Sequence, residues 1–466
     1  MNKKDWGGNK RTTYAQLGAS NHCLHERQSE DFYSTDPIAI NKLKRVYEIP
    51  NNIVEISAGD GHLSERLKEL GHNVISWDII ERNYPLDKIQ DFLGVKELPK
   101  GYSILTNPPF KCVDIETECY TKRGWLKYTE LNDSDEILSI NPNTLLVEWS
   151  KINYIIEKDI DEDVYHFKKS HMDILCTKGH RMFAYKHGKI SVKDGDLIHS
   201  EDTHSQHYIP RIGYSWEGNT IENFVLPSVS QTEQYTRKQI KKEEKEISMK
   251  YWLKFFGMWL ADGYCTHTNN SLGKPRYIVG IKQLAKNKDL IRDMLNNLPF
   301  KYTEHLDVSR KNPAINFEIY DKQLWQYLHQ FGKSHQKFIP TNIKELNSDY
   351  LQILVDAYFS GDGSQLKLKK QGNSFMSRTI SIKLAEDIQE ILFKLGYLSH
   401  VTESEYILQN KEKRTQYCQT ISKNSMYNKY FYPSCKKSKA HYKGKVWCPN
   451  LEKMGCFWQE EMARIL

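Results

Sequence analysis

Three groups of residues in this sequence have the types and spacing that chemistry requires. Asn107-Pro108-Pro109-Phe110 joins a side-chain amide, two residues without N–H groups and an aromatic ring. Cys112 follows two residues later, and a thiolate is a strong nucleophile once it is activated. Asp262 and Asp362 each end an apolar segment and precede a glycine, and paired carboxylates can share divalent metal ions. The helices and strands around each group must position its side chains for that chemistry.

Length and composition describe a soluble chain of several domains. The 466 residues suffice for roughly two to four domains, each with its own core. The chain is 39% hydrophobic and 27% charged, and no apolar run approaches the roughly eighteen residues that span a membrane. The first residues, Met1–Gly7, lack the apolar core of a secretory signal. We therefore expect a cytoplasmic protein with no membrane partner.

Cysteine positions and net charge limit the kinds of site and partner that the chain can have. The nine cysteines are scattered without a Cys-x-x-Cys pair, which argues against a disulfide framework and a structural zinc site. A cysteine with a special role is therefore expected to be a nucleophile. The net charge of +7 suits a nucleic-acid partner, and it suits a slightly basic soluble protein equally well.

A doubly wound α/β fold of the nucleotide-binding type is predicted near the start of the chain. Val54–Leu63 has the pattern of a buried strand and a tight turn, and a helix follows at Ser64–Leu70. Gly59 and Gly61 would let the backbone approach a ligand, although a simple strand-to-helix turn would also explain them. The next strand, 73–78, ends in an acid where such folds bind a ribose.

The acids and the tetrapeptide complete this first site. Glu55 and Asp78 would flank the cofactor, and Asp91 would lie near its base; a helix cap or solvated turn at Asp91 is an equal alternative. The segment 103–106 is predicted to be a strand that delivers Asn107–Phe110 to the carboxyl edge of the sheet. A polyproline loop would explain Pro108 and Pro109 alone, but not the amide, the aromatic ring and the upstream turn together.

With Asp31–Pro37, these motifs resemble the S-adenosylmethionine-dependent adenine DNA methyltransferases of the phage type, over about residues 30–111. The resemblance implies a partial Rossmann-like α/β fold and S-adenosylmethionine as cofactor. It also implies that Asn107 and Pro108 accept bonds from the amine of an extruded base while Phe110 stacks on its ring. Family members continue past the tetrapeptide with further strands, so this chain is not expected to methylate DNA as it stands.

A second resemblance begins at Cys112. The spacing Cys-x4-Thr-x3-Thr-x2-Gly over Cys112–Gly124, followed by Asp173–His180, resembles the first two blocks of an intein, a protein-splicing domain of the Hint type. The resemblance implies that Cys112 attacks the carbonyl of Lys111 to form a thioester. Thr177 and His180 would contact that amide, and His180 would protonate its nitrogen. A Thr-x-x-His alone is common by chance.

An all-β fold is predicted for this splicing region. Glu136–Ile140, Leu146–Trp149 and Val164–Phe167 are predicted to be short strands separated by turns rich in Asn, Pro and Asp. Cys119 and Cys176 are expected in its core.

Two similar helices are predicted after the charged run 241–246, which is expected to be a solvated boundary. Each is apolar and ends in Asp-Gly, at Asp262 and at Asp362, an offset of 362 − 262 = 100. Leu284-Ala285 recurs as Leu384-Ala385 at the same offset, which favours a duplicated unit. An Asp-Gly pair alone would indicate an ordinary capped helix.

Small residues suggest how the two helices pair. Gly257 and Ala357 occupy matching positions, so the helices can cross closely and bring Asp262 and Asp362 side by side around Mg2+. This arrangement resembles the LAGLIDADG homing endonucleases, which implies an α+β fold of two pseudo-symmetric halves and cleavage of double-stranded DNA.

Further segments carry the same resemblance. Lys333–Pro340 resembles the basic block between the two helices, and Lys337 would polarise a phosphate or water, or only hold a backbone phosphate; both roles stay open. The strands predicted at Tyr277–Ile281 and Ser377–Ile382 would face DNA.

The end of the chain resembles the penultimate intein block at Gly444–Asn450, whose strand would complete the β-fold. Family members go on to a terminal Asn and a Cys, Ser or Thr, so complete splicing in cis is not expected, and a C-terminal split partner is one way to supply these residues. The sequence thus predicts a multidomain monomer that carries an intein and an endonuclease inside a methyltransferase. The expected domains are residues 1–111 (methyltransferase part), 112–235 and 430–466 (splicing halves) and 245–405 (endonuclease). A non-catalytic relic, a DNA-binding module and a methyltransferase active only after splicing are the alternatives.

Overall fold

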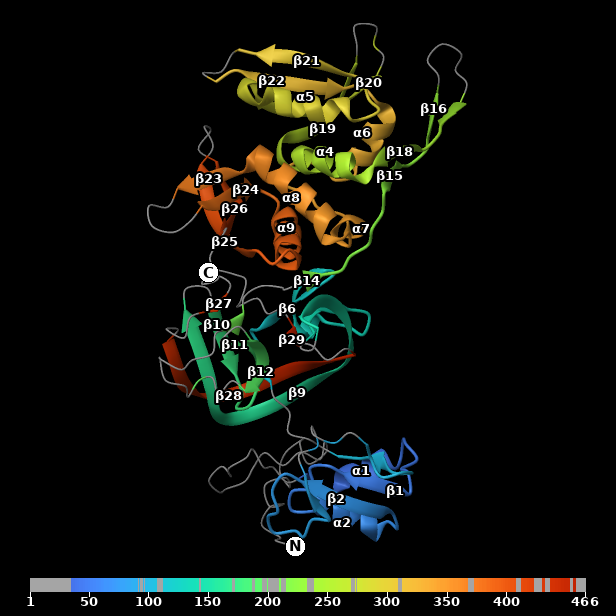
Figure 1. Cartoon of the computed structure of the whole chain (residues 1–466), viewed down its shortest axis with the longest axis vertical. Coiled ribbons are helices and arrows are strands. Elements are labelled where there is room, and N and C mark those ends of the chain that lie inside the picture. Colours follow the sequence, from blue (N-terminus) through green and yellow to red (C-terminus); the bar gives the residue numbers. More distant parts are fainter. Residues whose placement is uncertain are drawn as a thin grey trace. The chain divides into compact units, whose positions relative to one another are not determined.

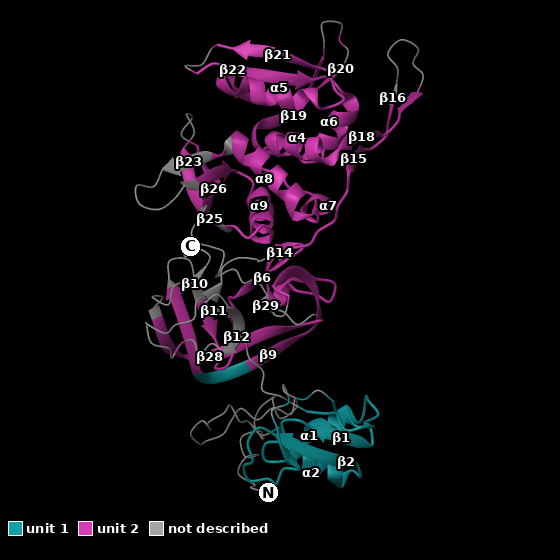
Figure 2. Cartoon of the chain, in the orientation of Figure 1, with its two compact units in different colours: residues 1–111, 159–162 teal, residues 112–158, 163–466 magenta. Residues whose placement is uncertain are grey.

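The computed structural model divides the chain into two compact units, which Figure 2 colours separately. Unit 1 comprises residues 1–111 and 159–162, and unit 2 comprises residues 112–158 and 163–466. The structure describes residues 35–90, 92, 95, 97–106, 112–141, 144–169, 172–186, 189–194, 199, 209–210, 215–232, 239–269, 273, 275–308, 312–367, 373–407, 412–422, 430–431, 436–452 and 456–457. Among these residues, no helix is long and apolar enough to cross a membrane.

Unit 1 is built on a parallel sheet with the strand order β3-β2-β1-β4. Its elements are α1 (Ile38–Leu43), β1 (Asn52–Glu55), α2 (His62–Glu69), β2 (Asn73–Asp78), β3 (Lys88–Ile89) and β4 (Ser103–Ile104). The apolar residues of β1 and β2 pack against the apolar face of α2, so that Ile53, Leu63, Leu67 and Val74 form one core. The predicted order of strand, turn, helix and strand is therefore confirmed for β1, α2 and β2.

The splicing region of unit 2 is a β-structure around a sheet with the path β10-β5-β28-β9-β8-β6-β7. Its main strands are β5 (Val113–Asp114), β6 (Glu118–Thr121), β7 (Gly124–Lys127), β8 (Glu136–Ile140), β9 (Leu146–Lys169), β10 (Met172–Cys176), β11 (Arg181–Lys186), β12 (Lys189–Asp194), β14 (Ser215–Trp216), β28 (Lys436–Leu451) and β29 (Cys456–Phe457). Cys119 and Cys176 are buried in its core, as expected. β28 comes from the end of the chain and pairs with β5, so the two predicted splicing halves form one sheet.

One strand prediction in this region is wrong. The segments Leu146–Trp149 and Val164–Phe167 are parts of a single strand, β9, which runs from Leu146 to Lys169. The acidic residues between them do not form a turn, because a strand that faces solvent on one side accepts charged residues there.

The endonuclease-like region contains two halves with the same order of elements (Figure 1). The first half is α4 (Met249–Asp262), β19 (Gly263–Asn269), β20 (Pro275–Leu284), α5 (Lys288–Asn296), β21 (Tyr302–Asp307) and β22 (Ala314–Ile319). The second half is α8 (Ser348–Asp362), β23 (Ser364–Lys367), β24 (Asn373–Thr379), α9 (Ile382–Lys394), β25 (Leu398–Ile407) and β26 (Lys413–Ser422). The sheets have the matching orders β19-β20-β22-β21 and β23-β24-β26-β25. Between the halves lie α6 (Lys322–His329) and α7 (Thr341–Lys344).

The offset of 100 holds for the two helices but not for the whole repeat. Leu284 ends β20 and is exposed, whereas Leu384 lies inside α9 and is buried. The two strands that follow α8, β23 and β24, are shorter than β19 and β20, so the helix of the second half begins earlier relative to Asp362. The Leu-Ala match was therefore fortuitous, although the duplication itself is present.

Several predicted boundaries also shift. The expected strand Ser377–Ile382 ends at Thr379, because Ser381 caps α9 by accepting a hydrogen bond from the N–H of Leu384. The expected domain end at residue 405 falls inside β25, and the sheet continues to Ser422. The charged run 241–246 lies in two strands, β17 (Gln239–Lys242) and β18 (Lys245–Ser248), and in the residues between them.

Within unit 2, the splicing region and the second endonuclease half share one hydrophobic core. Tyr120 and Trp216 from the splicing strands belong to the same buried cluster as Leu346 and Ile388. The indole N–H of Trp216 donates to the carbonyl of Leu346 at 2.9 Å. These two regions therefore pack as parts of one folded body.

Candidate functional sites

The two Asp-Gly helices cross at the small residues that the sequence singled out. A Cβ atom added to Gly257 of α4 would lie 2.6 Å from the carbonyl oxygen of Leu354 and 2.9 Å from the Cβ atom of Ala357 in α8. One turn further, a Cβ atom on Gly361 would lie 2.6 Å from the Cβ atom of Ala261 and 2.9 Å from Oδ2 of Asp262. The predicted close crossing of the helices is therefore confirmed, and it brings the last turn of α8 against the carboxylate of Asp262.

Asp262 lies in a partly buried site. Burial raises the pKa of its carboxyl group, and this effect is opposed by a hydrogen bond from Gln283 and by the charge of Lys337. The side-chain amide of Gln283 donates to Oδ2, while its own carbonyl oxygen accepts from Asn287 at 2.9 Å. Gln283 lies near the end of β20, and the sequence analysis missed it because an isolated Gln carries no motif.

Lys337 is buried, which neither of its two expected roles, in polarising a phosphate or water or in holding a DNA phosphate, predicts. The residue is only 3% exposed, and its ammonium group donates to the carbonyl oxygens of Trp259 at 2.8 Å, Leu260 at 3.0 Å and Gly263 at 2.8 Å. These carbonyls end α4, where a helix has unsatisfied acceptors and a partial negative charge. Lys337 thus holds the end of the helix that carries Asp262. A motif cannot reveal this contact, because its partners lie far away in the sequence.

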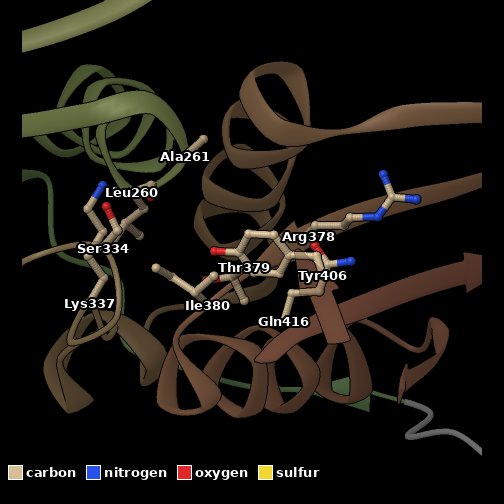
Figure 3. Close-up of a pocket in the computed structure, with 9 residues that line it drawn as sticks. All are labelled: Leu260, Ala261, Ser334, Lys337, Arg378, Thr379, Ile380, Tyr406 and Gln416. Carbon is tan, nitrogen blue, oxygen red and sulfur yellow. Dashed lines mark hydrogen bonds between the residues drawn. The ribbon is translucent and has the colours of Figure 1, made fainter. Parts of the chain in front are cut away.

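A cavity of about 230 Å³ opens beside the end of α4 (Figure 3). It lies between that helix end, the loop that carries Ser334 and Lys337, and strands β24 to β26 of the second half. Arg378, Thr379, Tyr406 and Gln416 line it from the strands. The cavity is therefore polar on the sheet side and lies close to Asp262.

Each sheet has one face turned away from the helices. In β20, Val279 and Ile281 lie in the core, so Arg276 and Lys282 face the opposite side. In β24, Ser377 is buried, and the register places Arg378 on the opposite face together with Gln416 of β26. The open faces thus carry cationic and amide groups, which suit phosphates and base edges.

Of the two expected metal ligands, Asp262 has a side chain that the structure describes. Among the described residues, no group of three or more His, Cys, Asp or Glu could hold an ion. The carboxylate of Asp262 suits Mg2+, which commonly uses one or two carboxylates and takes its other ligands from water and substrate phosphates. The side chain of Asp362 lies outside the description, and only its place as the last residue of α8 is known.

The amide at the start of the splicing region is held by Thr177. The hydroxyl oxygen of Thr177 accepts from the N–H of Cys112 at 2.9 Å, and the backbone N–H of Thr177 donates to the carbonyl of Cys112 at 3.0 Å. The N–H of Cys112 belongs to the Lys111–Cys112 peptide bond, which is the bond that the resemblance marks for attack. The expected contact from Thr177 is thus present.

His180 belongs to the same turn. Its backbone N–H donates to the carbonyl of Thr177 at 3.2 Å, and His180 and Cys112 are both buried. The turn after β5 is fixed by Asp114, which accepts from the backbone N–H of Thr117 at 3.1 Å and from its hydroxyl at 2.6 Å. The splicing motifs therefore meet around one peptide bond. The proton transfer expected of His180 stays a prediction.

In unit 1, the glycine turn is joined to the acid at the end of β2. The backbone N–H of Gly59 donates to Oδ2 of Asp78 at 2.8 Å, and Arg82 lies 3.4 Å from Oδ1. Gly61 begins α2 with a φ of 74°, and a Cβ atom there would lie 2.3 Å from the ring of Tyr84. Only glycine fits this turn. Gly59, Gly61 and Asp78 are therefore together at the carboxyl edge of the sheet.

Glu55 is more deeply buried than its expected role requires. It is 1% exposed, and the hydroxyl of Ser64 donates to its carboxylate, while the hydroxyl oxygens of Ser64 and Ser76 lie 2.7 Å apart. Burial raises the pKa of Glu55 to about 8, although the bonds from Ser64 lower it. Its carboxyl group thus lies between the sheet and α2, and its cofactor role stays a prediction. Asp91 and Asn107–Phe110 lie outside the described residues.

Comparison with protein families relates one segment of this chain to a known domain. Residues 349–431 match the model of the LAGLIDADG-like domain. The matched segment covers α8, both following strand pairs and α9, which together form the second half of the duplicated region.

Comparison with curated proteins gives relatives with dissimilar names. The chain is 23% identical to an ATP-dependent Clp protease proteolytic subunit of Chlamydomonas moewusii, over 66% of this chain and 30% of the relative. It is 26% identical to the C-terminal section of a DNA-directed RNA polymerase subunit beta of Stigeoclonium helveticum, with the same two shares. A ribosomal RNA small subunit methyltransferase A of Thermotoga petrophila is 32% identical over 19% of this chain and 38% of the relative. The chain thus spans less than half the length of each of these relatives.

Solved structures include the homing endonuclease I-DmoI bound to DNA and Mn, with 15% identity, a TM-score of 0.27, and coverage of 37% of this chain and 90% of that one. An AceL NrdHF class 3 split intein has 14% identity and a TM-score of 0.19, and the match covers 44% of this chain and 96% of that one. These TM-scores are too low to assign a fold. The match at residues 349–431 therefore relates the second half of the duplicated region to the LAGLIDADG-like domain.

Proposed function

We propose that the duplicated region of unit 2 is a site-specific endonuclease of the homing type, which cuts double-stranded DNA. The observation that carries this proposal is the crossing of α4 and α8 at Gly257 and Ala357, which sets the last turn of α8 against Asp262. The LAGLIDADG-like match at residues 349–431 supports it independently. The first half has the same order of elements, so the region supplies two similar half-sites in one chain.

The chain's own residues have distinct parts in this reaction. Asp262 and Asp362 would hold Mg2+, which when bound lowers the pKa of a coordinated water and stabilises the leaving oxygen of a phosphodiester. Gln283 orients the carboxylate of Asp262, and Lys337 fixes the helix end that carries it. The cationic faces around Arg276 and Arg378 would position the DNA backbone, since contacts to phosphates set register.

Cleavage of a plasmid that carries the uninterrupted methyltransferase gene, with Mg2+ present, tests this proposal. Asp262→Asn and Asp362→Asn should each abolish cutting, because each removes one carboxylate from the paired site. Asp356→Asn is the matched control: it lies on α8 as well, but is exposed. Cutting that persists in either site variant would overturn the assignment of the paired aspartates, and DNA binding without any cutting by the unmodified chain would favour a non-catalytic relic or DNA-binding module.

We propose as a second function that Cys112 forms a thioester with the carbonyl of Lys111. The hydrogen bond from the N–H of Cys112 to the hydroxyl oxygen of Thr177 supports this proposal, because that N–H belongs to the amide that must break. The thiol adds to the carbonyl carbon, the C–N bond breaks, and the freed amine of Cys112 takes a proton, for which His180 is the expected donor.

Hydroxylamine should then release residues 1–111 from the chain as a hydroxamic acid. Cys112→Ala should release nothing, and Thr177→Val should slow release by about tenfold or more, since it removes an oriented hydrogen bond at the amide. Release that is unchanged in Cys112→Ala would mean that the nucleophile is another group.

Unit 1 is proposed to be the S-adenosylmethionine-binding part of an adenine DNA methyltransferase. The parallel sheet and the bond from Gly59 to Asp78 support this, because cofactors bind at the carboxyl ends of such strands. Similarity to a ribosomal RNA methyltransferase is in keeping with it. Methyl transfer would require the strands that follow Phe110 in this family, and a methyltransferase active only after splicing is the alternative.

The relatives also support an insertion. Two proteins with unrelated names match about two thirds of this chain each, which is more than unit 1 can supply. A module found in otherwise unrelated proteins fits an element that inserts into host genes.

A further inference from the structure

The pairing of β5 with β28 brings two cysteines of distant sequence position together. Val446 lies opposite Asp114, and Trp447 lies opposite Val113, in an antiparallel register. Continuing this register by one residue, to the residue that precedes β5, places Cys448 opposite Cys112. Residues opposite each other on antiparallel strands have Cβ atoms about 4.5–5.5 Å apart.

The burial pattern places both thiols on the same face of the sheet. Val113 and Trp447 belong to the buried core of the splicing region, so they point to its inner side. Because side chains alternate along a strand, Cys112 and Cys448 share the opposite side. Neither belongs to the core cluster that contains their neighbours.

The other neighbour of β5 repeats this geometry. Cys176 of β10 lies opposite Val113 and is in the same core, so the next residue, Thr177, shares the face of Cys112. The hydrogen bonds between Thr177 and Cys112 agree with this placement. Three strands thus place Thr177, Cys112 and Cys448 in one row, with the attacking thiol between a hydroxyl and a second thiol.

Both cysteines are thiols in this structure, and they differ in exposure. Cys112 is fully buried, whereas Cys448 is partly exposed. A disulfide needs Cα atoms about 4.4–6.8 Å apart, a range that opposite residues of an antiparallel pair satisfy. An oxidant would therefore meet Cys448 first, and Cys112 would be within reach without rearrangement of the strands.

We propose that Cys112 and Cys448 form a reversible disulfide that switches off the thiol at Cys112. In the first step, the thiolate of Cys448 attacks a small-molecule disulfide and releases one thiol. Cys112 then loses its proton and attacks the sulfur of Cys448, which releases the second thiol. Two protein thiols are oxidised and one external disulfide is reduced to two thiols, so the exchange balances. The consequence for splicing rests on the proposed thioester function, whereas the disulfide itself does not.

The full chain treated with excess glutathione disulfide tests the pair directly. Trypsin digestion without reductant should give one linked species that joins residues 112–122 to residues 446–453. Residues 112–122 also contain Cys119, so fragment ions must assign the bond to Cys112. The linked species should vanish after dithiothreitol and be absent from Cys448→Ser, whereas Cys418→Ser, which removes another partly exposed thiol, should retain it. Glutathione on Cys448 with an alkylatable Cys112, or a bond from Cys448 to another cysteine, would overturn the proposal.

A second readout separates this inference from the proposed thioester. Oxidation should lower the hydroxylamine-induced release of residues 1–111 by about tenfold or more, because the nucleophilic thiol is consumed, and dithiothreitol should restore release. If the linked species forms but the reduced chain releases nothing, the thioester proposal fails and the disulfide stands. If the reduced chain releases residues 1–111 but no link forms, the disulfide proposal fails alone. Release that persists in a fully linked chain would contradict the switch.

Discussion

The charge and burial of individual residues in this protein depend on contacts with residues that are distant in the sequence. Asp262 could be named from the Asp-Gly ending of its helix, because that pattern occurs twice. The partners that fix its charge, Gln283 and Lys337, come from a strand end and from a loop beyond the first half. Lys337 stood out as basic, but its burial depends on three carbonyl acceptors at the end of α4. Residue types thus indicate the acid, and the fold decides its environment.

The hydrogen bond from Gln283 should affect the pH dependence of DNA cleavage. Because this bond lowers the pKa of Asp262 against the effect of burial, Gln283→Leu should raise that pKa further. The acidic limb of the cleavage rate profile should then move to higher pH, with activity partly recovered in alkaline buffer. A profile that drops uniformly, without a shift, would indicate that Gln283 has only a structural role.

Glu55 should give unit 1 a pH-dependent stability. Its pKa rises from 4.5 to about 8 on folding, so the unfolded state loses this proton near pH 4.5 and the folded state keeps it until about pH 8. Stability from this group is therefore complete below pH 4.5 and falls between pH 4.5 and 8, by up to roughly 5 kcal/mol. Glu55→Gln should remove this slope in thermal unfolding measured from pH 5 to 8. An equal slope in both proteins would assign it to other groups.

Among the elements, the crossing of α4 and α8 was the most predictable feature and the strand lengths the least. Apolar runs that end in Asp-Gly fix the end of each helix, and Gly257 with Ala357 indicates where the two meet. The strand β9 escaped prediction because its acidic middle resembles a turn, and Leu384 was misplaced because β23 and β24 are shorter than β19 and β20. Hydrophobic periodicity thus predicts elements that have one buried face, and it fails where a strand is mostly exposed to solvent.

The helix crossing should not tolerate a larger residue at Gly257. Gly257→Val would place its Cβ atom 2.6 Å from the carbonyl of Leu354, so the helices must separate. We expect a loss of about 2–3 kcal/mol in unfolding free energy, together with weaker cleavage. Asp356→Val puts the same β-branched residue on the exposed side of α8 and should cost well under about 1 kcal/mol. Equal losses in the two variants would mean that helix propensity, not the crossing, is responsible.

At the scale of the whole molecule, unit 2 is held together by charges that are buried between its splicing and endonuclease regions. Glu390 of α9 accepts from Lys344 at 2.6 Å, from Lys394 at 2.8 Å and from the hydroxyl of Tyr120 in β6 at 3.0 Å. Burial opposes ionisation of Glu390, but the two lysines lower its pKa overall. No local pattern predicts this contact, because Tyr120 and Glu390 lie in regions that the sequence separates into different domains.

Removal of the charge on Glu390 should destabilise both regions together. Glu390→Gln removes the carboxylate that the two buried lysines share, while Asp387 and Glu345 still accept from them, and we expect a loss of about 1–3 kcal/mol. Glu405→Gln is the control, because its pair with Lys413 is 2.9 Å long but exposed and should contribute at most about 1 kcal/mol. Denaturant unfolding followed by tryptophan fluorescence measures both losses. Two separate transitions, of which Glu390→Gln shifts only one, would contradict a common core.

The measurement that tests the endonuclease most directly is a comparison of two DNA targets with the same purified chain. One target carries the methyltransferase gene without the interruption after codon 111, and the other carries the interrupted gene. With Mg2+ present, the chain should cut the first at one place near that junction and leave the second intact, because the insertion separates the two half-sites. Asp262→Asn should leave both uncut. Equal cutting of both targets, or cutting that Asp262→Asn does not reduce, would contradict the assignment of this region as a homing endonuclease.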